Sequence, residues 1–314
     1  MNWKPTSSIE HLKRRSEFMK DIRHFFDDRG YLEVETPYMG HFGVTDPHLA
    51  NIEAQFRGQT YQLQTSPEYH MKRLLAAGSG PIFQIARVFR HDGFGRWHNP
   101  EFTLLEWYQL GVDHYYLIDE IQCLFKQLCD APLFQFMTYQ QAFERYCHMN
   151  PFDISQREIQ QVCEKLGYGN VLATDESIDQ HLHLLMAMVV EPGIAKDYEA
   201  PVVMLDFPAS QASLAKTEGN IAHRFEIYWQ GVELANGFHE LTDVQLQLAR
   251  FEEDNRLRQQ MNFPVKAVDH LLLAALEHGM PACSGVALGL DRLFALILKQ
   301  PGIANVFSFA FPQL

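Results

Sequence analysis

The chain has 314 residues, of which 46% are hydrophobic and 21% charged, and its formal net charge is −13 at pH 7. This composition predicts a globular core, and no apolar run reaches the roughly 18–20 residues that a membrane-spanning helix needs. An acidic chain is also a poor general nucleic-acid binder, because each phosphate contact needs a basic residue.

The cysteines, the N-terminal segment and the absence of several common motifs narrow the class of protein further. The start, MNWKPTSSIEHLKRR, lacks the apolar centre of a signal peptide, and the odd number of cysteines contains no CxxC pair. We therefore expect reduced thiols and a cytoplasmic protein. The sequence has no Walker-A loop, no GxGxxG after a strand, no GxSxG and no HExxH.

In chain order, the first half alternates helices and hairpins. Residues 7–29 predict an amphipathic helix, with Ser7 and Glu10 as a capping box and Gly30 as the stop. YLEVETPYM predicts a short strand that ends at Pro37. IEAQF and TYQLQT predict a hairpin, TSPEYHMKRLL a helix with Ser66 as N-cap, and PIFQIARVFR and EFTLLEWYQL two paired strands.

The second half predicts one amphipathic helix at 113–130 and several shorter helices between about 138 and 195. VVMLDF predicts a buried strand, and AHRFEIYWQGVELANGF a long strand that is broken at Asn236-Gly237. Residues 243–262 and 267–278 predict helices, and CSGVALGLDRLFALIL predicts a strand, a glycine turn and a helix. We expect a single domain over residues 1–314 with a helical insertion at about 138–195.

The first helix concentrates basic residues in an otherwise acidic chain. It is either a solvated face or a docking surface for an acidic macromolecule, in which case charge reversal at Arg14 and Arg15 slows the reaction with that partner. The residues are Lys4, Lys13, Arg14, Arg15, Lys20 and Arg23.

EFTLLEWYQL places a carboxylate among apolar side chains. Alternate residues of a strand share a face, so Glu106 and Tyr108 lie on the same surface as Phe102. A carboxylate buried there needs a cation. The cation is either a ligand ammonium or an internal arginine, with Tyr108 then only packing.

Two further segments have the composition of nucleotide sites. Arg90, at the end of a strand, offers a fork to a phosphate or forms a surface pair with Asp92. In GVALGLDR, the glycines allow close backbone approach and Arg292 lies in the first helical turn, which suits a nucleotide or an ordinary strand–helix connection.

VELANGFHEL contains two glutamates seven residues apart. Glu233 and Glu240 face opposite sides of an unbroken strand, but a turn or bulge at Asn236-Gly237 brings them together. Converging carboxylates are ligands for Mg²⁺, and the alternative is two solvated glutamates.

The order of these segments resembles that of a known family. A strand that ends in proline, then FRHDGFGRWHNPEFTLLEWY and finally GVALGLDR resemble motifs 1, 2 and 3 of the class II aminoacyl-tRNA synthetases. TSPEYHMKR and VELANGFHELTD narrow the likeness to the lysyl-tRNA synthetase catalytic domain. The resemblance implies an α+β fold, with an antiparallel β-sheet flanked by helices, and a homodimer formed through the motif 1 region.

Three departures refine the resemblance. The motif 1 helix starts almost at Met1, so we expect no anticodon-binding barrel. Asp92 stands where Glu is usual, and Ala287 where Gly is typical. A short acidic chain of this kind is similar to the ligases that attach (R)-β-lysine to elongation factor P. That resemblance implies ATP and Mg²⁺ as cofactors, elongation factor P as acceptor and no tRNA. The alternatives are a truncated lysyl- or aspartyl-type enzyme that charges tRNA, and a non-catalytic regulatory paralogue.

The resemblance also assigns residues. The catalytic residues it implies are Arg90, Glu240 and Arg292, and the Mg²⁺ ligands are Glu233 and Glu240. The Ala287 methyl is expected to crowd α-lysine more than its β isomer. ATP binding is implied for Arg90, His91, Asp92, His98, Asn99, Phe102, Glu233, Leu234, Gly289 and Arg292. Binding of the amino acid is implied for Ser66, Pro67, Glu68, Glu106, Tyr108, Glu240 and Ala287.

Overall fold

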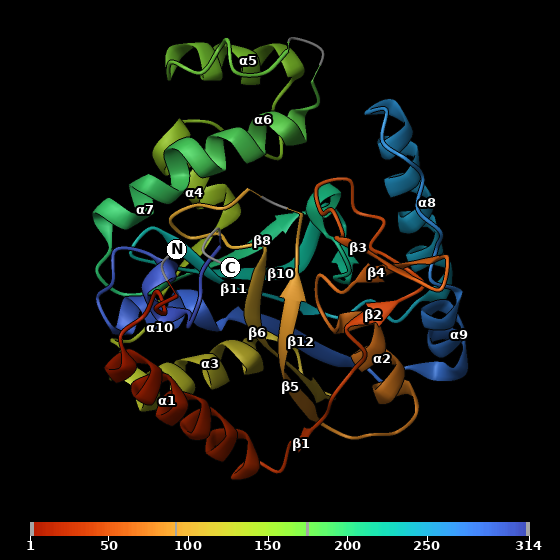
Figure 1. The fold of residues 1–314 in the computed structure, drawn as a ribbon. Helices are drawn as coiled ribbons and strands as arrows, with labels where there is room; N and C mark the ends of the chain where they lie inside the picture. The colour runs from red at the N-terminus through yellow and green to blue at the C-terminus, as the bar shows by residue number, and fades with distance from the viewer. Residues whose placement is uncertain (1–2, 92, 174–175, 312–314) are drawn as a thin grey trace. The chain divides into compact units, whose positions relative to one another are not determined.

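The computed structural model describes residues 3–91, 93–173 and 176–311 (Figure 1). It divides into two compact units, one formed by residues 1–129 and 240–314 and the other by residues 130–239. In each unit, mainly antiparallel strands are flanked by helices. This confirms the predicted fold class, whereas the organisation as one domain with an insertion stays a prediction.

The main sheet of the first unit has the strand order β1-β5-β6-β12. β1 runs parallel to β5, and the other neighbours are antiparallel. The helices α1 and α3 cover the face on which Trp107 lies, since its ring contacts Phe26 of α1 and its Nε1 donates to Glu120 of α3. The bounds are α1 (Ile9–Asp27), β1 (Leu32–Glu33), β5 (Ile82–Phe89), β6 (Glu101–Leu110), α3 (His114–Cys129) and β12 (Cys283–Gly289).

The start of α1 differs from the predicted capping box. Ser8, not Ser7, is the N-cap, and its Oγ accepts from the His11 N–H at 3.1 Å. Ser7 is buried and donates instead to the Asn305 carbonyl at 2.6 Å. The predicted cap was wrong because a contact distant in sequence uses the Ser7 hydroxyl, which the local pattern does not reveal.

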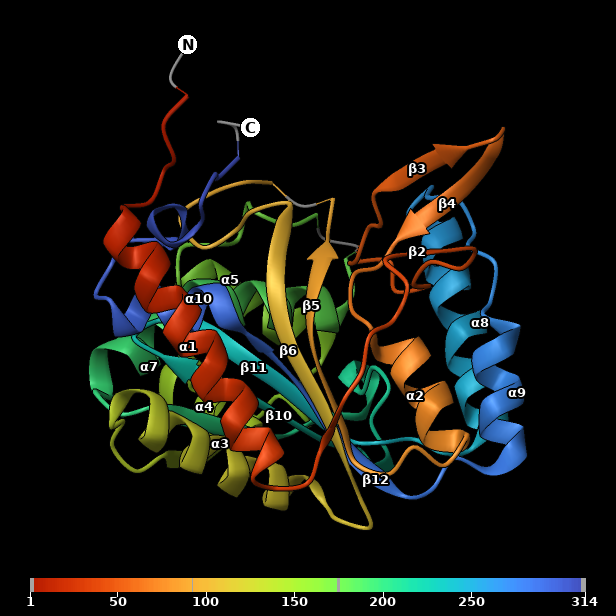
Figure 2. The ribbon, with the colours of Figure 1, turned by 60° about the horizontal axis from the view of Figure 1, so that its bottom comes forward.

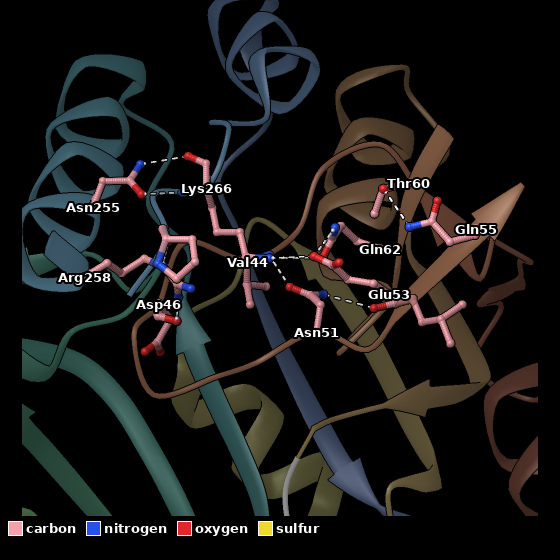
Figure 3. Close-up of polar contacts among 12 residues, drawn as sticks. Val44, Asp46, Asn51, Glu53, Gln55, Thr60, Gln62, Asn255, Arg258 and Lys266 are labelled. Carbon is pink, nitrogen blue, oxygen red and sulfur yellow. Dashed lines mark hydrogen bonds and ion pairs between the residues drawn. The ribbon is translucent and has the colours of Figure 1, made fainter. Parts of the chain in front are cut away.

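A small second sheet of the first unit has the order β2-β4-β3, with β2 at Met39–Gly40, β3 at Glu53–Phe56 and β4 at Gln59–Leu63. The predicted hairpin turn is confirmed, since Arg57 and Gly58 both have positive φ, the geometry of a tight hairpin. Asn51 ties the loop before β3 to β4, accepting from the Val44 N–H and donating to the Leu63 carbonyl (Figure 3).

Helix α8 (Val244–Gln260) and the segment after it brace this hairpin (Figure 3). Asn255 bonds both the N–H and the carbonyl of Lys266, whose Nζ lies 3.4 Å from Glu53 Oε1. Arg258 donates to the carbonyls of Pro264 and Asp46. These contacts fix the hairpin whose last strand leads into the candidate site.

The other helices of the first unit are α2 (Glu68–Ala76), α9 (His270–Gly279), α10 (Leu290–Ile297) and the short 3₁₀ helix η3 (Ile303–Val306). α2 packs on α9 and α9 on α8, and α10 packs on β6 (Figure 2). The helices predicted at 243–262 and 267–278 are thus confirmed to within a few residues.

In the second unit, the strand order is β11-β10-β8-β7, with β9 pairing to β10. The helices of this unit, green in Figure 1, include three that begin with a Ser or Thr capping box, at Thr138, Ser155 and Ser177. The bounds are β7 (Gln135–Thr138), α4 (Tyr139–Cys147), α5 (Gln156–Lys165), α6 (Ile178–Leu185), η1 (Met186–Val190), α7 (Glu191–Asp197), β8 (Val202–Pro208), η2 (Ala209–Gln211), β9 (Thr217–Glu218), β10 (Ile221–Trp229) and β11 (Val232–His239).

The break in the long strand lies elsewhere than predicted. The chain turns at Gln230-Gly231, both with positive φ, whereas Asn236 pairs across the ladder with Glu226 inside β11. The register shifts at Leu234, which is the extra residue of a bulge on β11. The bulge reverses the alternation of side chains after Glu233, so the predicted irregularity exists at a different residue.

No helix in the described part of the chain is both long and apolar enough to span a membrane.

Candidate active site

The candidate site is built on the face of β6 opposite α1 and α3. Tyr108 donates its hydroxyl to Glu106 Oε1 at 2.7 Å, which confirms that the two side chains share a surface. On the neighbouring strand β12, Ala287 pairs with Glu106 and Gly285 with Tyr108. Both polar side chains are 2% exposed, so the carboxylate is buried.

The start of α2 supplies the next groups. Ser66 donates its hydroxyl to Glu106 Oε2 at 2.6 Å and accepts from the Glu68 N–H at 3.1 Å. Pro67 is the N-cap, so the helix begins one residue later than predicted. The partners of Glu106 are thus a serine and a tyrosine, rather than the internal arginine considered as an alternative.

Lys72, which the sequence analysis missed, joins the glutamates of this site. Its Nζ lies 2.7 Å from Glu68 Oε1 and 2.6 Å from Glu240 Oε2, and its side chain is 2% exposed. Burial lowers the pKa of Lys72, but the charges of Glu240 and Glu68 outweigh it and raise the pKa overall. The Glu-x-x-x-Lys spacing on a helix was the available signal for one of these pairs.

Burial makes the carboxyl groups of Glu106 and Glu240 difficult to ionise. It raises the pKa of Glu106 to about 7, with a further contribution from the charge of Glu68. It raises the pKa of Glu240 to about 8, partly offset by Lys72. Glu68 and Glu240 pair with the one ammonium of Lys72, and Glu106 is a third carboxylate of the cluster, so two negative charges remain uncompensated when all groups are ionised.

Gly285 is required by the close approach of its neighbours. A Cβ there would lie 2.2 Å from Tyr108 Cε1 and 2.6 Å from Glu240 Oε1. Glu240 is held near this strand because its N–H donates to the Cys283 carbonyl at 3.0 Å. Ala287 packs, together with Phe102, against the apolar cluster of Ala86, Val88 and Leu104.

Two of the predicted ATP-binding residues lie together on the first unit. The guanidinium of Arg90 lies 5.0 Å from the centroid of the Phe102 ring, and its Nε is 3.4 Å from the Thr65 carbonyl. Phe102 belongs to the face of β6 that carries Glu106, so the aromatic ring and the cation beside it lie on the same side of the sheet as the acidic cluster.

Five more of the predicted ATP-binding residues, Arg292, His98, Asn99, His91 and Gly289, lie in the first unit. Arg292 donates to the Trp97 carbonyl, and its Nη2 is 3.0 Å from His98 Nε2. Asn99 bonds the backbone of Glu101 and Phe311, the His91 N–H donates to the Ala50 carbonyl, and Gly289 is the N-cap of α10. Asp92 lies outside the described residues.

The predicted Mg²⁺ ligands fall in different units. Glu233 and Leu234 belong to β11 of the second unit, whereas Glu240 belongs to the first. The donor set fits incompletely, since Glu240 already pairs with Lys72. Within the described ranges, no cluster of three or more His, Cys, Asp or Glu side chains suits a metal ion. Metal binding by Glu233 and Glu240 therefore stays a prediction.

The prediction of a basic surface on the first helix is wrong for one residue. Arg15 is not part of an exposed surface, because its side chain is 13% exposed and its Nη2 lies 2.5 Å from Asp291 Oδ1. Lys13, Arg14 and Lys20 are exposed, and Arg23 pairs with Glu33. The predicted charge reversal at Arg14 and Arg15 would therefore also break a buried ion pair.

Comparison with known families agrees with the order of the motifs. Residues 1–313 match the model of the class II tRNA synthetases (D, K and N). This match spans all of the residues of the first unit that form the acidic cluster and the Arg90–Phe102 pair. The chain therefore belongs to the class II tRNA synthetase (D, K and N) family, whose domain points to ATP-dependent activation of an amino acid.

Proposed function

We propose that the protein activates (R)-β-lysine with ATP and transfers it to a lysine side chain of elongation factor P. The observation that carries the proposal is the acidic cluster, in which Glu68 and Glu240 pair with the internal ammonium of Lys72 and the buried Glu106 interacts with its charge without a direct contact. Buried charge is costly unless it is paired, so the cluster favours a ligand that brings two ammonium groups.

This charge balance distinguishes between the amino acids of the family. Aspartate would add a carboxylate to a site with excess negative charge, and the side chain of asparagine brings no charge. Lysine and β-lysine both supply two amines. Within the family the cluster therefore favours a diamino acid.

The placement of the groups suggests how such an acid is bound. Glu106 and Tyr108 receive the side-chain ammonium, and Ser66, Glu68 and Glu240 receive the other amine. Ala287 lies opposite Glu106 on the adjacent strand. A β-amine is one carbon further from the carboxylate than an α-amine, so the Ala287 methyl favours the β isomer by a preference rather than absolutely.

The reaction has two steps. The carboxylate oxygen of the amino acid attacks the α-phosphorus of ATP, and the bond to pyrophosphate breaks, giving an acyl-adenylate. The uncharged amine of the acceptor lysine then attacks the acyl carbon, the bond to AMP breaks, and an amide forms with release of the amine proton. Mg²⁺, when bound, supplies charge neutralisation for the phosphates.

The residues of this chain bind and orient the reactants. Arg90 offers a fixed guanidinium to the α-phosphate, and Phe102 and Arg292 sandwich the adenine. Tyr108 and Ser66 hold the Glu106 carboxylate by hydrogen bonds, so that it does not reorganise as the ammonium enters.

The test is ATP–pyrophosphate exchange with (R)-β-lysine, α-lysine, aspartate and asparagine. The expected order places (R)-β-lysine first and the last two at background. Exchange driven best by aspartate or asparagine would overturn the proposal, and no exchange with any of them would favour a non-catalytic paralogue. Against that paralogue, Arg90, Glu233, Glu240 and Arg292 are all present.

The family match itself supports a second candidate, the charging of tRNA. Parallel transfer of radiolabelled amino acid to elongation factor P and to bulk tRNA separates the two. We expect label on the protein, because a chain with a net charge of −13 offers an unfavourable background for tRNA. The cytoplasmic location and the homodimer are further parts of this proposal.

A further inference from the structure

A buried polar link joins α1, β6 and the start of α10. Arg15 Nη2 lies 2.5 Å from Asp291 Oδ1 and donates to Thr103 Oγ1 at 3.0 Å. The second oxygen of Asp291 accepts from the Thr103 N–H at 2.6 Å. The three residues therefore form a closed set of contacts, with one member from each element.

The link continues the pairing of two strands. The ladder between β12 and β6 ends with Gly289 opposite Leu104, so Thr103 lies one residue beyond it. There the Asp291 carboxylate takes the place of the next strand residue as acceptor for the Thr103 N–H. Asp291 thereby fixes the direction in which α10 leaves β12.

Each end of the link adjoins a residue proposed to bind ATP. Thr103 follows Phe102 on β6, and the two point to opposite faces, so the link acts from behind the sheet. Asp291 precedes Arg292 in the first turn of α10. Arg15 holds both neighbours through one guanidinium group, since it contacts Thr103 and Asp291 together.

Burying the ion pair between Arg15 and Asp291 removes two charges from water, which costs free energy and makes stability alone a poor explanation for it. The side chain of Asp291 is 3% exposed and that of Arg15 13%. A buried ion pair commonly gives no more stability than apolar residues of the same volume. Both contacts of Arg15 come from one atom, Nη2, so a single cationic nitrogen fixes Thr103 and Asp291 relative to each other.

We propose that Arg15 is a positioning residue for the nucleotide, and that it sets the spacing between Phe102 and Arg292. The inference rests on the proposed use of ATP by this site. Arg15 is covered by its partners and does not touch the substrates; its effect passes through Thr103 and Asp291.

The test compares Arg15→Met with Arg256→Met in the full-length protein. The control removes an arginine from an exposed ion pair with Glu253 on α8, where side chains are 53% and 52% exposed. We expect Arg15→Met to raise the KM for ATP by about tenfold or more, with the KM for the amino acid within about twofold, because misplacement of a binding group weakens only its own ligand. Arg256→Met leaves both unchanged.

Two further variants show which contact of Arg15 is responsible for the rise in the KM for ATP. Arg15→Lys keeps a cation, but its ammonium is carried on a shorter side chain and reaches Thr103 and Asp291 less well, so it gives an intermediate KM for ATP. Thr103→Val removes one contact of Arg15 and keeps the bond from the Thr103 N–H to Asp291, so it gives a smaller rise. Thr103→Val also provides the readout if Arg15→Met does not fold.

Calorimetric titration with ATP separates failure of this inference from failure of the proposed function. If the unaltered protein binds no ATP, the proposed function fails, and the inference with it. If it binds ATP and Arg15→Met binds equally well, only the inference is overturned. A parallel rise in both KM values would indicate a general structural role and would overturn it too.

Discussion

Glu106 and Glu240 show how single residues are shaped by their surroundings. In the folded, ligand-free protein their pKa values are raised to about 7 and about 8, mainly by burial, whereas an unburied glutamate has 4.5. The folded state thus retains protons that the unfolded chain releases. The corresponding stability is fully present below about pH 4.5 and is lost as the pH rises through 7 and 8.

We therefore expect the melting temperature of the ligand-free protein to fall between about pH 5 and pH 8. Glu106→Gln should flatten part of this dependence, because a glutamine does not titrate. A diamino acid should raise the melting temperature more at the upper end of the range, where its ammonium groups meet ionised carboxylates. If the melting temperature changed with pH equally steeply in the unaltered protein and in Glu106→Gln, Glu106 would not titrate in this range.

Ala287 provides the residue-scale prediction on selectivity. Ala287→Gly removes the methyl opposite Glu106, and exchange with α-lysine should rise by about tenfold or more relative to (R)-β-lysine. Unchanged exchange with α-lysine would refute this account of selectivity.

A matched change two residues earlier on β12 is expected to lower the exchange activity instead of raising it. Gly285→Ala places a methyl against the Tyr108 ring and Glu240, so exchange with either isomer should fall by about a hundredfold.

At the scale of elements, the helix that carries Glu68 and Lys72 depends on its neighbour α9. Asp269 is buried and caps α9, accepting from the Leu271 and Leu272 N–H groups at 2.9 and 3.0 Å. Asp269→Ala should lower the free energy of unfolding by about 1 kcal/mol and raise the KM for the amino acid, since α2 packs on α9.

Asp243→Ala is the control for this prediction. Asp243 is exposed and caps α8 through the Gln245 and Leu246 N–H groups. Its loss should cost a similar free energy of unfolding in denaturant titrations, without a change in KM. Equal KM values for the two variants would mean that the cap of α9 has no influence on the site.

At the scale of the whole molecule, the acidic chain presents a small basic surface on α1. With Arg15 buried, that surface consists of exposed residues such as Lys13, Arg14 and Lys20. If it docks an acidic acceptor protein, Lys13→Glu with Arg14→Glu should slow transfer by about tenfold at low salt and leave adenylate formation unchanged. Transfer and pyrophosphate exchange are measured side by side.

The control reverses two exposed charges on α5, in Arg157→Glu with Lys165→Glu. This double variant makes the same change in net charge at another place. If the α1 surface docks the acceptor, transfer by this control should stay unchanged. Equal slowing in both double variants would indicate a general effect of net charge rather than docking.

The sequence by itself determined what depends on near neighbours in the chain. Alternation along EFTLLEWYQL placed Glu106 and Tyr108 on one surface, and the Arg-Gly-Gln hairpin and most helices followed from local patterns. The order of the motifs indicated the family, which the match over residues 1–313 shows. Each of these features needs only the geometry of a strand, a turn or a helix.

Only the tertiary structure decided which distant groups meet. The pairing of Lys72 with Glu240 joins segments far apart in the chain, and so does that of Arg15 with Asp291. Likewise, the Ser7 hydroxyl was predicted to cap the first helix but donates to the Asn305 carbonyl instead. Local patterns fix the direction of a side chain relative to its own element, but its partner and its burial arise from the packing of elements against one another.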